Sequence, residues 1–152
     1  AAFAKSQLAA SMRLPVPDGQ PLTAFLAVND ADKPTAAQVA AKLVALGFRI
    51  LATDGTHAHL ATAGVPSERI NKVREGRPHC VDRMVDGDVH LVVNTTEGAD
   101  SVRDSFSLRR TALMRGLAYF TTMSAARAAA IAIQRLQAGD MSVRSLQEFQ
   151  SA

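Results

Sequence analysis

Short apolar runs alternate along the chain with segments in which apolar residues recur at helical spacing. The run 22–28 (LTAFLAV) is apolar apart from one threonine and ends at Asn29 and Asp30. The run 89–95 (VHLVVNT) has the same character. Continuous apolar runs of this length are typical of strands that are buried on both faces. The pattern predicts five strands, at 22–28, 48–53, 69–73, 89–95 and 117–121.

The segments between these runs have the features of helices. Val39, Leu43 and Leu46 recur at helical spacing in the clearest of them. Asp32 is a candidate N-cap before this helix, and Gly47 is the expected stop because glycine adopts the left-handed conformation that ends many helices. The pattern predicts helices at 36–46, 57–63, 81–86, 105–116 and 123–138, with two further short helices at 2–12 and 143–149.

Strand and helix alternate five times, which predicts an α/β fold of three layers. The expected architecture is a five-stranded, mostly parallel sheet with helices on both faces, of the Rossmann type. Residues 14–19 (LPVPDG) contain two prolines and a glycine, so they are expected to form a linker, and the domain is expected to begin near Pro21. In such folds ligands bind outside the carboxyl ends of the strands.

The composition narrows the function classes. The 17 basic and 14 acidic residues are scattered, and the chain has one tyrosine and no tryptophan, so nucleic-acid binding is not expected. No apolar run reaches about 18 residues, so no membrane partner is expected. A single cysteine, Cys80, excludes a disulfide framework. His57 and His59 are two apart and would point to different faces of a helix, so no metal site is expected.

Hydroxyl, amide and ammonium groups follow the predicted strands. A glycine lies between two threonines at a predicted helix start, where free N–H groups and the helix dipole favour an anion. Two interpretations remain open: these residues are only turns and helix caps, or together they cradle a phosphate. The phosphate interpretation assigns Lys33, Thr53, Thr56, Lys72, Asn94 and Thr96.

Three strings carry a resemblance to a known family: NKVREGRPHCVD at 71–82, LVVNTTEG at 91–98 and DSFSLRRTAL at 104–113. The chain resembles the C-terminal allosteric domain of the carbamoyl phosphate synthetase large subunit, whose fold is that of methylglyoxal synthase. The resemblance runs from about Thr23 to the C-terminus. The opening AFAKSQLAA resembles the last helix of the preceding synthetase domain, so the expected division is 1–20 for that helix and linker and 21–152 for the allosteric domain.

The resemblance implies a regulatory function without chemistry or cofactor in this domain. It implies binding of nucleotide effectors, with UMP inhibiting and IMP activating, and control of carbamoyl phosphate formation for pyrimidine and arginine biosynthesis. The parent chain would be a cytoplasmic, glutamine-hydrolysing, ATP-dependent ligase that uses Mg and K ions and pairs with a small glutaminase subunit.

The resemblance also assigns residues. Its phosphate-binding positions match the six residues named above. The ribose and base of the effector would lie near Val73, Cys80 and Leu108. Ornithine would bind between this domain and an adjoining synthetase domain, where the matching residues are Tyr119 and Thr121.

Two stretches depart from the family pattern. Ala99 and Asp100 stand where related bacterial sequences often have arginines, and 123–126 (MSAA) replaces a stretch that is often glycine-rich. The alternatives are a methylglyoxal synthase-type phosphate lyase, a related nucleotide-processing cyclohydrolase and a pure interaction module. The lyase would need a carboxylate base, for which Glu75 and Asp54 are the candidates.

Overall fold

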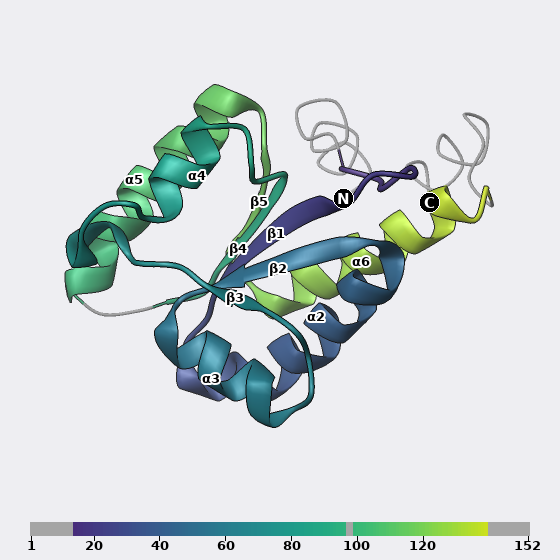
Figure 1. Ribbon diagram of the computed structural model, residues 1–152, viewed down its shortest axis with the longest axis horizontal. Helices are drawn as coiled ribbons and strands as arrows, with labels where there is room; N and C mark the ends of the chain where they lie inside the picture. The colour runs from purple at the N-terminus through teal and green to yellow at the C-terminus, as the bar shows by residue number, and fades with distance from the viewer. Residues whose placement is uncertain (1–13, 97–98, 140–152) are drawn as a thin grey trace.

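A five-stranded sheet runs through the centre of the protein (Figure 1). The computed structural model describes residues 14–96 and 99–139. Every strand pairing in these residues is parallel, in the order β3-β2-β1-β4-β5. The strands are β1 (Leu22–Ala27), β2 (Phe48–Ala52), β3 (Glu68–Arg69), β4 (Leu91–Asn94) and β5 (Ala118–Phe120).

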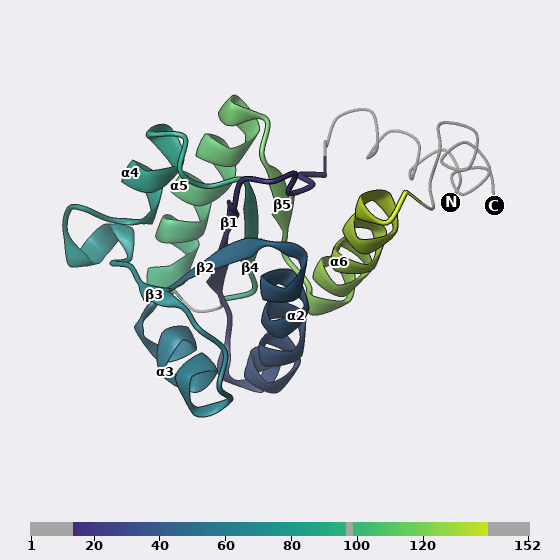
Figure 2. The ribbon, with the colours of Figure 1, turned by 45° about the vertical axis from the view of Figure 1, so that its right-hand side comes forward.

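Helices cover both faces of the sheet, so the predicted three-layer α/β fold is confirmed. In Figure 1, α4 and α5 lie on one side of the strands, and α2, α3 and α6 lie on the other; the turned view of Figure 2 shows the same separation. None of the helices in the described segments is long and apolar enough to cross a membrane. The helices are α2 (Lys33–Leu46), α3 (Asp54–Thr62), α4 (Cys80–Val85), α5 (Ala99–Arg115) and α6 (Met123–Gln137), with short 3-10 turns η1 (Asp30–Asp32) and η2 (Val73–Glu75).

The central strand β1 explains why its sequence is apolar without alternation. Successive side chains of a strand point to opposite faces, and here both faces are covered. Ala24 and Leu26 lie in the core beneath α2 and α6. Phe25 and Ala27 lie in the second core, beneath α4 and α5. β1 is therefore buried on both sides, as its composition predicts.

The third strand is shorter than predicted. The predicted range 69–73 is a strand only at Arg69, which pairs with Ala52 of β2. Val73 begins the turn η2 instead, because the Glu75 carboxylate accepts a 2.7 Å hydrogen bond from the Lys72 backbone N–H and folds the chain back. The prediction of a strand through Val73 was therefore wrong, and the chain turns at the edge of the sheet.

The starts of several helices also differ from the predicted ones, whereas the end of α2 agrees. Asp32 is at the N-cap position of α2, as predicted, but its side chain makes no cap hydrogen bond. The turn η1 precedes α2, and the Asn29 side chain caps that turn by accepting the Asp32 N–H at 2.9 Å. Gly47 ends α2 in the left-handed region, with φ of 111°, as predicted. Helix α5 begins at Ala99, six residues before the predicted start, and α3 begins at Asp54. The helices predicted at 2–12 and 143–149 lie outside the described residues.

The predicted linker packs against the domain. Leu14 and Val16 contact the core beneath α2 and α6. The Gln137 amide at the end of α6 donates to the Pro17 carbonyl at 3.1 Å and to the Leu46 carbonyl at 2.7 Å. Residues 14–17 are thus held by the end of α6.

Replacing Leu26 by alanine tests the importance of this core. Leu26 has no exposed surface, so Leu26→Ala is expected to lower the free energy of unfolding by about 2–5 kcal/mol. Leu113→Ala is the matched control, because Leu113 is 81% exposed and its truncation should change stability by less than about 0.5 kcal/mol. Urea unfolding of the two variants measures both values, and equal losses would contradict the assignment of the core.

Candidate anion-binding site

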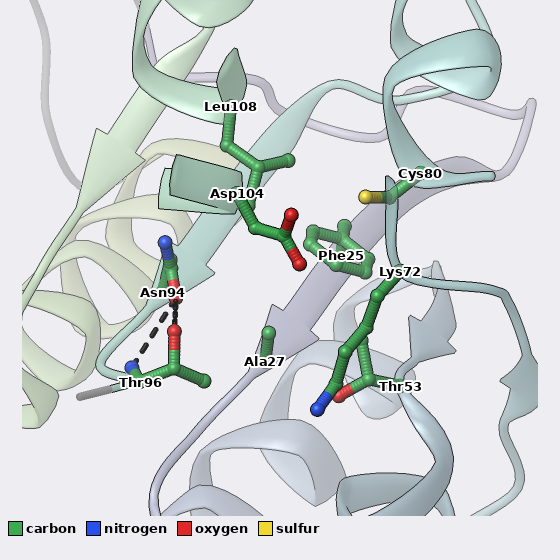
Figure 3. A pocket seen from close by; sticks show the side chains of 9 residues that line it. All are labelled: Phe25, Ala27, Thr53, Lys72, Cys80, Asn94, Thr96, Asp104 and Leu108. Carbon is green, nitrogen blue, oxygen red and sulfur yellow. Dashed lines mark hydrogen bonds between the residues drawn. The ribbon is translucent and has the colours of Figure 1, made fainter. Parts of the chain in front are cut away.

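The order of the strands creates a crevice at one edge of the sheet. The chain runs from β1 outward to β2 and β3, then returns to place β4 on the other side of β1. The strand order thus reverses between β1 and β4, and open α/β sheets bind ligands at such a point. The residues that leave these two strands are joined there, because Asn29 donates to the Thr95 hydroxyl at 3.2 Å and to the Thr95 carbonyl at 3.0 Å. A pocket of about 300 Å³, its open mouth included, lies here (Figure 3). Its walls are Phe25, Ala27, Thr53, Lys72, Cys80, Asn94, Thr96, Asp104 and Leu108.

Six of the residues assigned from the sequence meet in this pocket. They are Thr53, Lys72, Cys80, Asn94, Thr96 and Leu108. Four of them lie at or just after the ends of β2, β3 and β4, and Cys80 and Leu108 come from α4 and α5. The strand ends therefore converge in space. Their binding roles stay predictions.

One side of the pocket carries hydrogen-bond donors and positive charge. Thr53 is the N-cap residue of α3, but its hydroxyl makes no cap hydrogen bond, and the first N–H groups of a helix have no intrahelical acceptor. Lys72 lies beside it, and Figure 3 shows the ammonium of Lys72 and the hydroxyl of Thr53 turned to the same side of the pocket. A helix N-terminus and an ammonium group both favour an anion.

Lys33 adds a second cation at the start of α3. A Cβ atom added to Gly55 would lie 3.6 Å from the Lys33 Nζ, so the ammonium lies against the first turn of that helix. Lys33 also forms an ion pair with Asp30, and this hydrogen bond holds the pKa of the Asp30 carboxyl below its usual value. Lys33 is not among the residues that line the pocket.

Thr56 supports the site from within the protein. The side chain is fully buried, and its hydroxyl oxygen accepts the Val28 backbone N–H at 3.2 Å. This bond fastens the first turn of α3 to the end of β1. Thr56 therefore positions the helix N-terminus and does not line the pocket.

The opposite side of the pocket is held by Asn94 and Thr96. The Asn94 Oδ1 accepts the Thr96 hydroxyl at 2.6 Å and the Thr96 backbone N–H at 3.2 Å. The Asn94 Nδ2 donates to the Ser105 hydroxyl at 2.9 Å and to the Tyr119 hydroxyl at 3.0 Å. These donors are already engaged, so an anion that uses them must replace one of these bonds.

Tyr119 and Thr121 lie in a neighbouring, wider pocket of about 860 Å³, its open mouth included. Asn94 and Thr96 line both pockets. The Arg109 guanidinium lies 5.6 Å from the centre of the Tyr119 ring, at cation–π distance. The described residues that line this second pocket include no carboxylate.

The floor of the first pocket is apolar. Phe25, Cys80 and Leu108 are each almost fully buried. Burial raises the pKa of the Cys80 thiol to about 12, so the thiol is neutral at physiological pH and contributes a small apolar surface. Val73, assigned to the ribose and base side, packs against the same core but does not line the pocket.

Sequence reasoning missed Asp104 as a site residue. Its carboxylate is only 14% exposed, points into the pocket in Figure 3, and lies 3.9 Å from the Arg74 guanidinium. The residue stands in the string DSFSLRRTAL that carried the resemblance, so its signal was present. It was not recognised because only the packing of α5 places residue 104 opposite Lys72.

Comparison with known proteins identifies the family. A family model described as "MGS-like domain" matches residues 35–121. The chain belongs to the MGS-like domain family. The matched range includes the pocket residues from Thr53 to Leu108, whereas Phe25 and Ala27 lie before it.

Three similar proteins have the same name, "Carbamoyl phosphate synthase large chain". The chain is 46% identical over 148 residues to the protein of Myxococcus xanthus, 47% to that of Brucella suis and 49% to that of Mesorhizobium japonicum. Each match covers 97% of this chain but only 12–13% of the relative. The chain thus spans about an eighth of the length of the curated relatives it matches. In residues 14–96 and 99–139, no group of three or more His, Cys, Asp or Glu side chains is arranged to hold a metal ion.

The neutral state of Cys80 can be tested by alkylation with iodoacetamide. Burial raises the pKa of this thiol from 9.0 to about 12, so at pH 9 the folded protein should hold roughly 500-fold less thiolate than the unfolded chain. Alkylation, followed by mass spectrometry, is expected to be slower by that order in native protein than in urea. Equal rates would contradict the burial of the thiol.

The same shift sets a direction for stability at alkaline pH. Between pH 9 and 12 the folded protein keeps the Cys80 proton that the unfolded chain releases. The folded state then binds more protons, so this contribution to stability falls as the pH rises through that window. Cys80→Ala should lack this part of the alkaline decline in a urea unfolding series.

Proposed function

We propose that this domain binds nucleoside monophosphates, UMP and IMP, and regulates a glutamine-dependent carbamoyl phosphate synthase of which it is a part. The observation that supports the proposal is the pocket at the carboxyl ends of the strands. It combines a cationic, donor-rich side at Thr53 and Lys72, an apolar floor and, as the one carboxylate among the described lining residues, Asp104. Such a division suits a ligand with an anionic end and a neutral, hydroxyl-bearing body.

The phosphate group is assigned to the side of the pocket beside α3. Thr53 supplies an uncapped hydroxyl, the first turn of α3 supplies N–H groups, and Lys72 supplies charge. Charge-assisted hydrogen bonds of this kind are about twice as strong as neutral ones. The Lys33 ammonium, which pairs with Asp30, lies against Gly55 at the same helix start.

The sugar is assigned to the side of Asp104. A carboxylate repels phosphate but accepts hydrogen bonds from hydroxyl groups, so Asp104 favours the ribose diol. Cys80 and Leu108 offer apolar contact to the base and no buried charge, and they therefore suit a planar, neutral ring.

The far side of the phosphate requires an exchange of hydrogen bonds. Asn94 and Thr96 now bond to each other, and Asn94 also donates to Ser105 and Tyr119. Binding of the phosphate would turn the Thr96 hydroxyl or the Asn94 amide toward the new acceptor. The proposal therefore includes a local rearrangement at the end of β4.

Ornithine is proposed to bind beside Tyr119 and Thr121 only when another part of the parent chain contributes. Two ammonium groups need carboxylate partners when they are buried. The described lining of that pocket supplies hydroxyls and the positive charge of Arg109. The glutaminase subunit, the ATP and metal chemistry, and the cytoplasmic location belong to the proposed parent enzyme.

The proposal predicts selective stabilisation by nucleotides that carry phosphate. UMP or IMP at about 100 times its dissociation constant should add about 2.7 kcal/mol to the free energy of unfolding. For a domain of this size, that corresponds to a rise in Tm of roughly 5–10 °C. Uridine and inosine should give no comparable shift, because they lack the group that Lys72 and the start of α3 would hold. Differential scanning fluorimetry measures all four.

The same experiment includes two informative controls. Ornithine is expected to give no shift with this domain alone, for the reason given above. Equal shifts from uridine and UMP would remove the phosphate assignment, and no shift with any nucleotide would remove the proposed function.

Lys72→Ala tests the assigned cation. Loss of a charge-assisted hydrogen bond should weaken UMP or IMP binding by about 10- to 100-fold in calorimetry, with little change in Tm. Lys42→Ala is the matched control, because Lys42 is also half-buried but donates to Gln134 on the other face of the sheet. Unchanged affinity in the Lys72 variant would place the phosphate elsewhere.

The lyase alternative is separable by assay. Neither candidate base lies in the pocket: Asp54 and Glu75 each lie beside Arg69 instead. Asp104 does line the pocket, and it is the carboxylate that such a reaction would use. Formation of methylglyoxal from dihydroxyacetone phosphate, abolished by Asp104→Asn, would replace the regulatory proposal; no product is expected.

A further inference from the structure

We infer that Arg69, at the edge of the sheet, is a positioning residue that sets Lys72 and the start of α3 at the correct separation for a phosphate. The inference rests on the proposed function, because it concerns how the same pocket is held ready. Arg69 is not among the residues that line the pocket, so we propose no contact between Arg69 and the ligand.

Arg69 connects two segments that are distant in sequence. Its Nε donates to the Asp54 carboxylate at 3.1 Å. Asp54 is the first residue of α3 and directly follows Thr53. On the other side, the Arg69 Nη1 donates to the Asn71 Oδ1 at 3.1 Å, and its Nη2 lies 3.9 Å from the Glu75 Oε2.

The second group of contacts involves residues on both sides of Lys72 in the sequence. The Glu75 Oε1 accepts the Lys72 backbone N–H at 2.7 Å, while Glu75 Oε2 faces Arg69. Asn71 accepts from Arg69 and donates to the Gly76 carbonyl at 3.2 Å. The turn that carries Lys72 is thus closed by Glu75 and Asn71, and both are joined to Arg69.

One guanidinium therefore joins the start of α3, whose free N–H groups are electropositive, to the turn that carries the Lys72 ammonium. Asp54 belongs to the helix whose N-terminus faces the anion, and Asn71 and Glu75 belong to the turn that carries the ammonium. Arginine suits this position because its planar fork presents several donors in fixed directions, which a lysine ammonium cannot reproduce. Loss of the fork would let the Lys72 turn move relative to α3.

The size of the effect follows from exposure. The side chains of Arg69 and Asp54 are 44% and 70% exposed, and single ion pairs of this kind contribute little to stability. A network with three acceptors has more influence on geometry than on overall stability. We therefore expect weaker ligand binding with an almost unchanged Tm.

A simple charge effect makes a different prediction. Arg69 is a cation near an anion site, so it could strengthen binding through its field alone. Arg69→Lys retains the charge but cannot reach all three acceptors, whereas Arg69→Gln removes the charge as well. Positioning predicts that both variants bind weakly; a field effect predicts that Arg69→Lys binds like the wild type.

The closing experiment measures IMP and UMP affinity by calorimetry in four proteins: wild type, Arg69→Lys, Arg69→Gln and Arg83→Gln. Arg83 is the matched control, because its side chain pairs with Glu68 and Asp88 on the same edge, and neither of these is among the described residues that line the pocket. We expect the two Arg69 variants to bind roughly three- to tenfold more weakly and Arg83→Gln to stay within about twofold of wild type. Wild-type affinity in either Arg69 variant would overturn the inference and leave the proposed function intact.

A second readout needs no nucleotide. The Lys72 amide hydrogen is held by Glu75, so its exchange with deuterated water should be faster in Arg69→Lys than in wild type, and unchanged in Arg83→Gln. Unchanged exchange in Arg69→Lys would overturn the inference by itself. If wild-type protein binds neither nucleotide, the proposed function fails and this inference fails with it.

Discussion

The structure depends on one constraint: all the strands of a parallel sheet end at the same edge. Because the described strands of this protein run the same way, the residues that follow β1, β2, β3 and β4 are brought to one edge without any other device. The return of the chain from β3 across to β4 then reverses the strand order between β1 and β4, which is where open α/β sheets bind ligands. A crevice lined by polar groups from three strand ends, β2, β3 and β4, is the direct result.

The crevice is electrically divided. Lys72 and the start of α3 supply positive potential on one side, and Asp104 supplies a negative charge on the other. Between these sides, the floor is neutral because burial keeps the Cys80 thiol protonated. A uniformly cationic pocket would accept any anion, whereas this division favours an anion attached to a body rich in hydroxyl groups.

The two sides of the site differ in how ready they are for a ligand. Around α3 the donors are uncapped, and Arg69 and Thr56 hold the helix start by bonds that do not occupy the pocket. At the end of β4 the donors Asn94 and Thr96 bond to each other. An anion bound here would find free donors beside α3. At the end of β4, where the neighbouring pocket begins, it would have to replace existing hydrogen bonds.

The sequence by itself determined the layered sheet and six of the residues that line the pocket, since buried parallel strands are continuous apolar runs and their polar ends must converge. It could not predict where the third strand stops, because the turn at Val73 depends on the hydrogen bond that the Glu75 carboxylate accepts from the Lys72 backbone N–H. Nor could it place Asp104 in the pocket or Arg69 between α3 and the Lys72 turn. Asp104 reaches the pocket through the packing of α5, and Arg69 acts through contacts with Asp54, fifteen residues away in sequence. Such relations depend on the distance between elements in space, which only the tertiary structure decides.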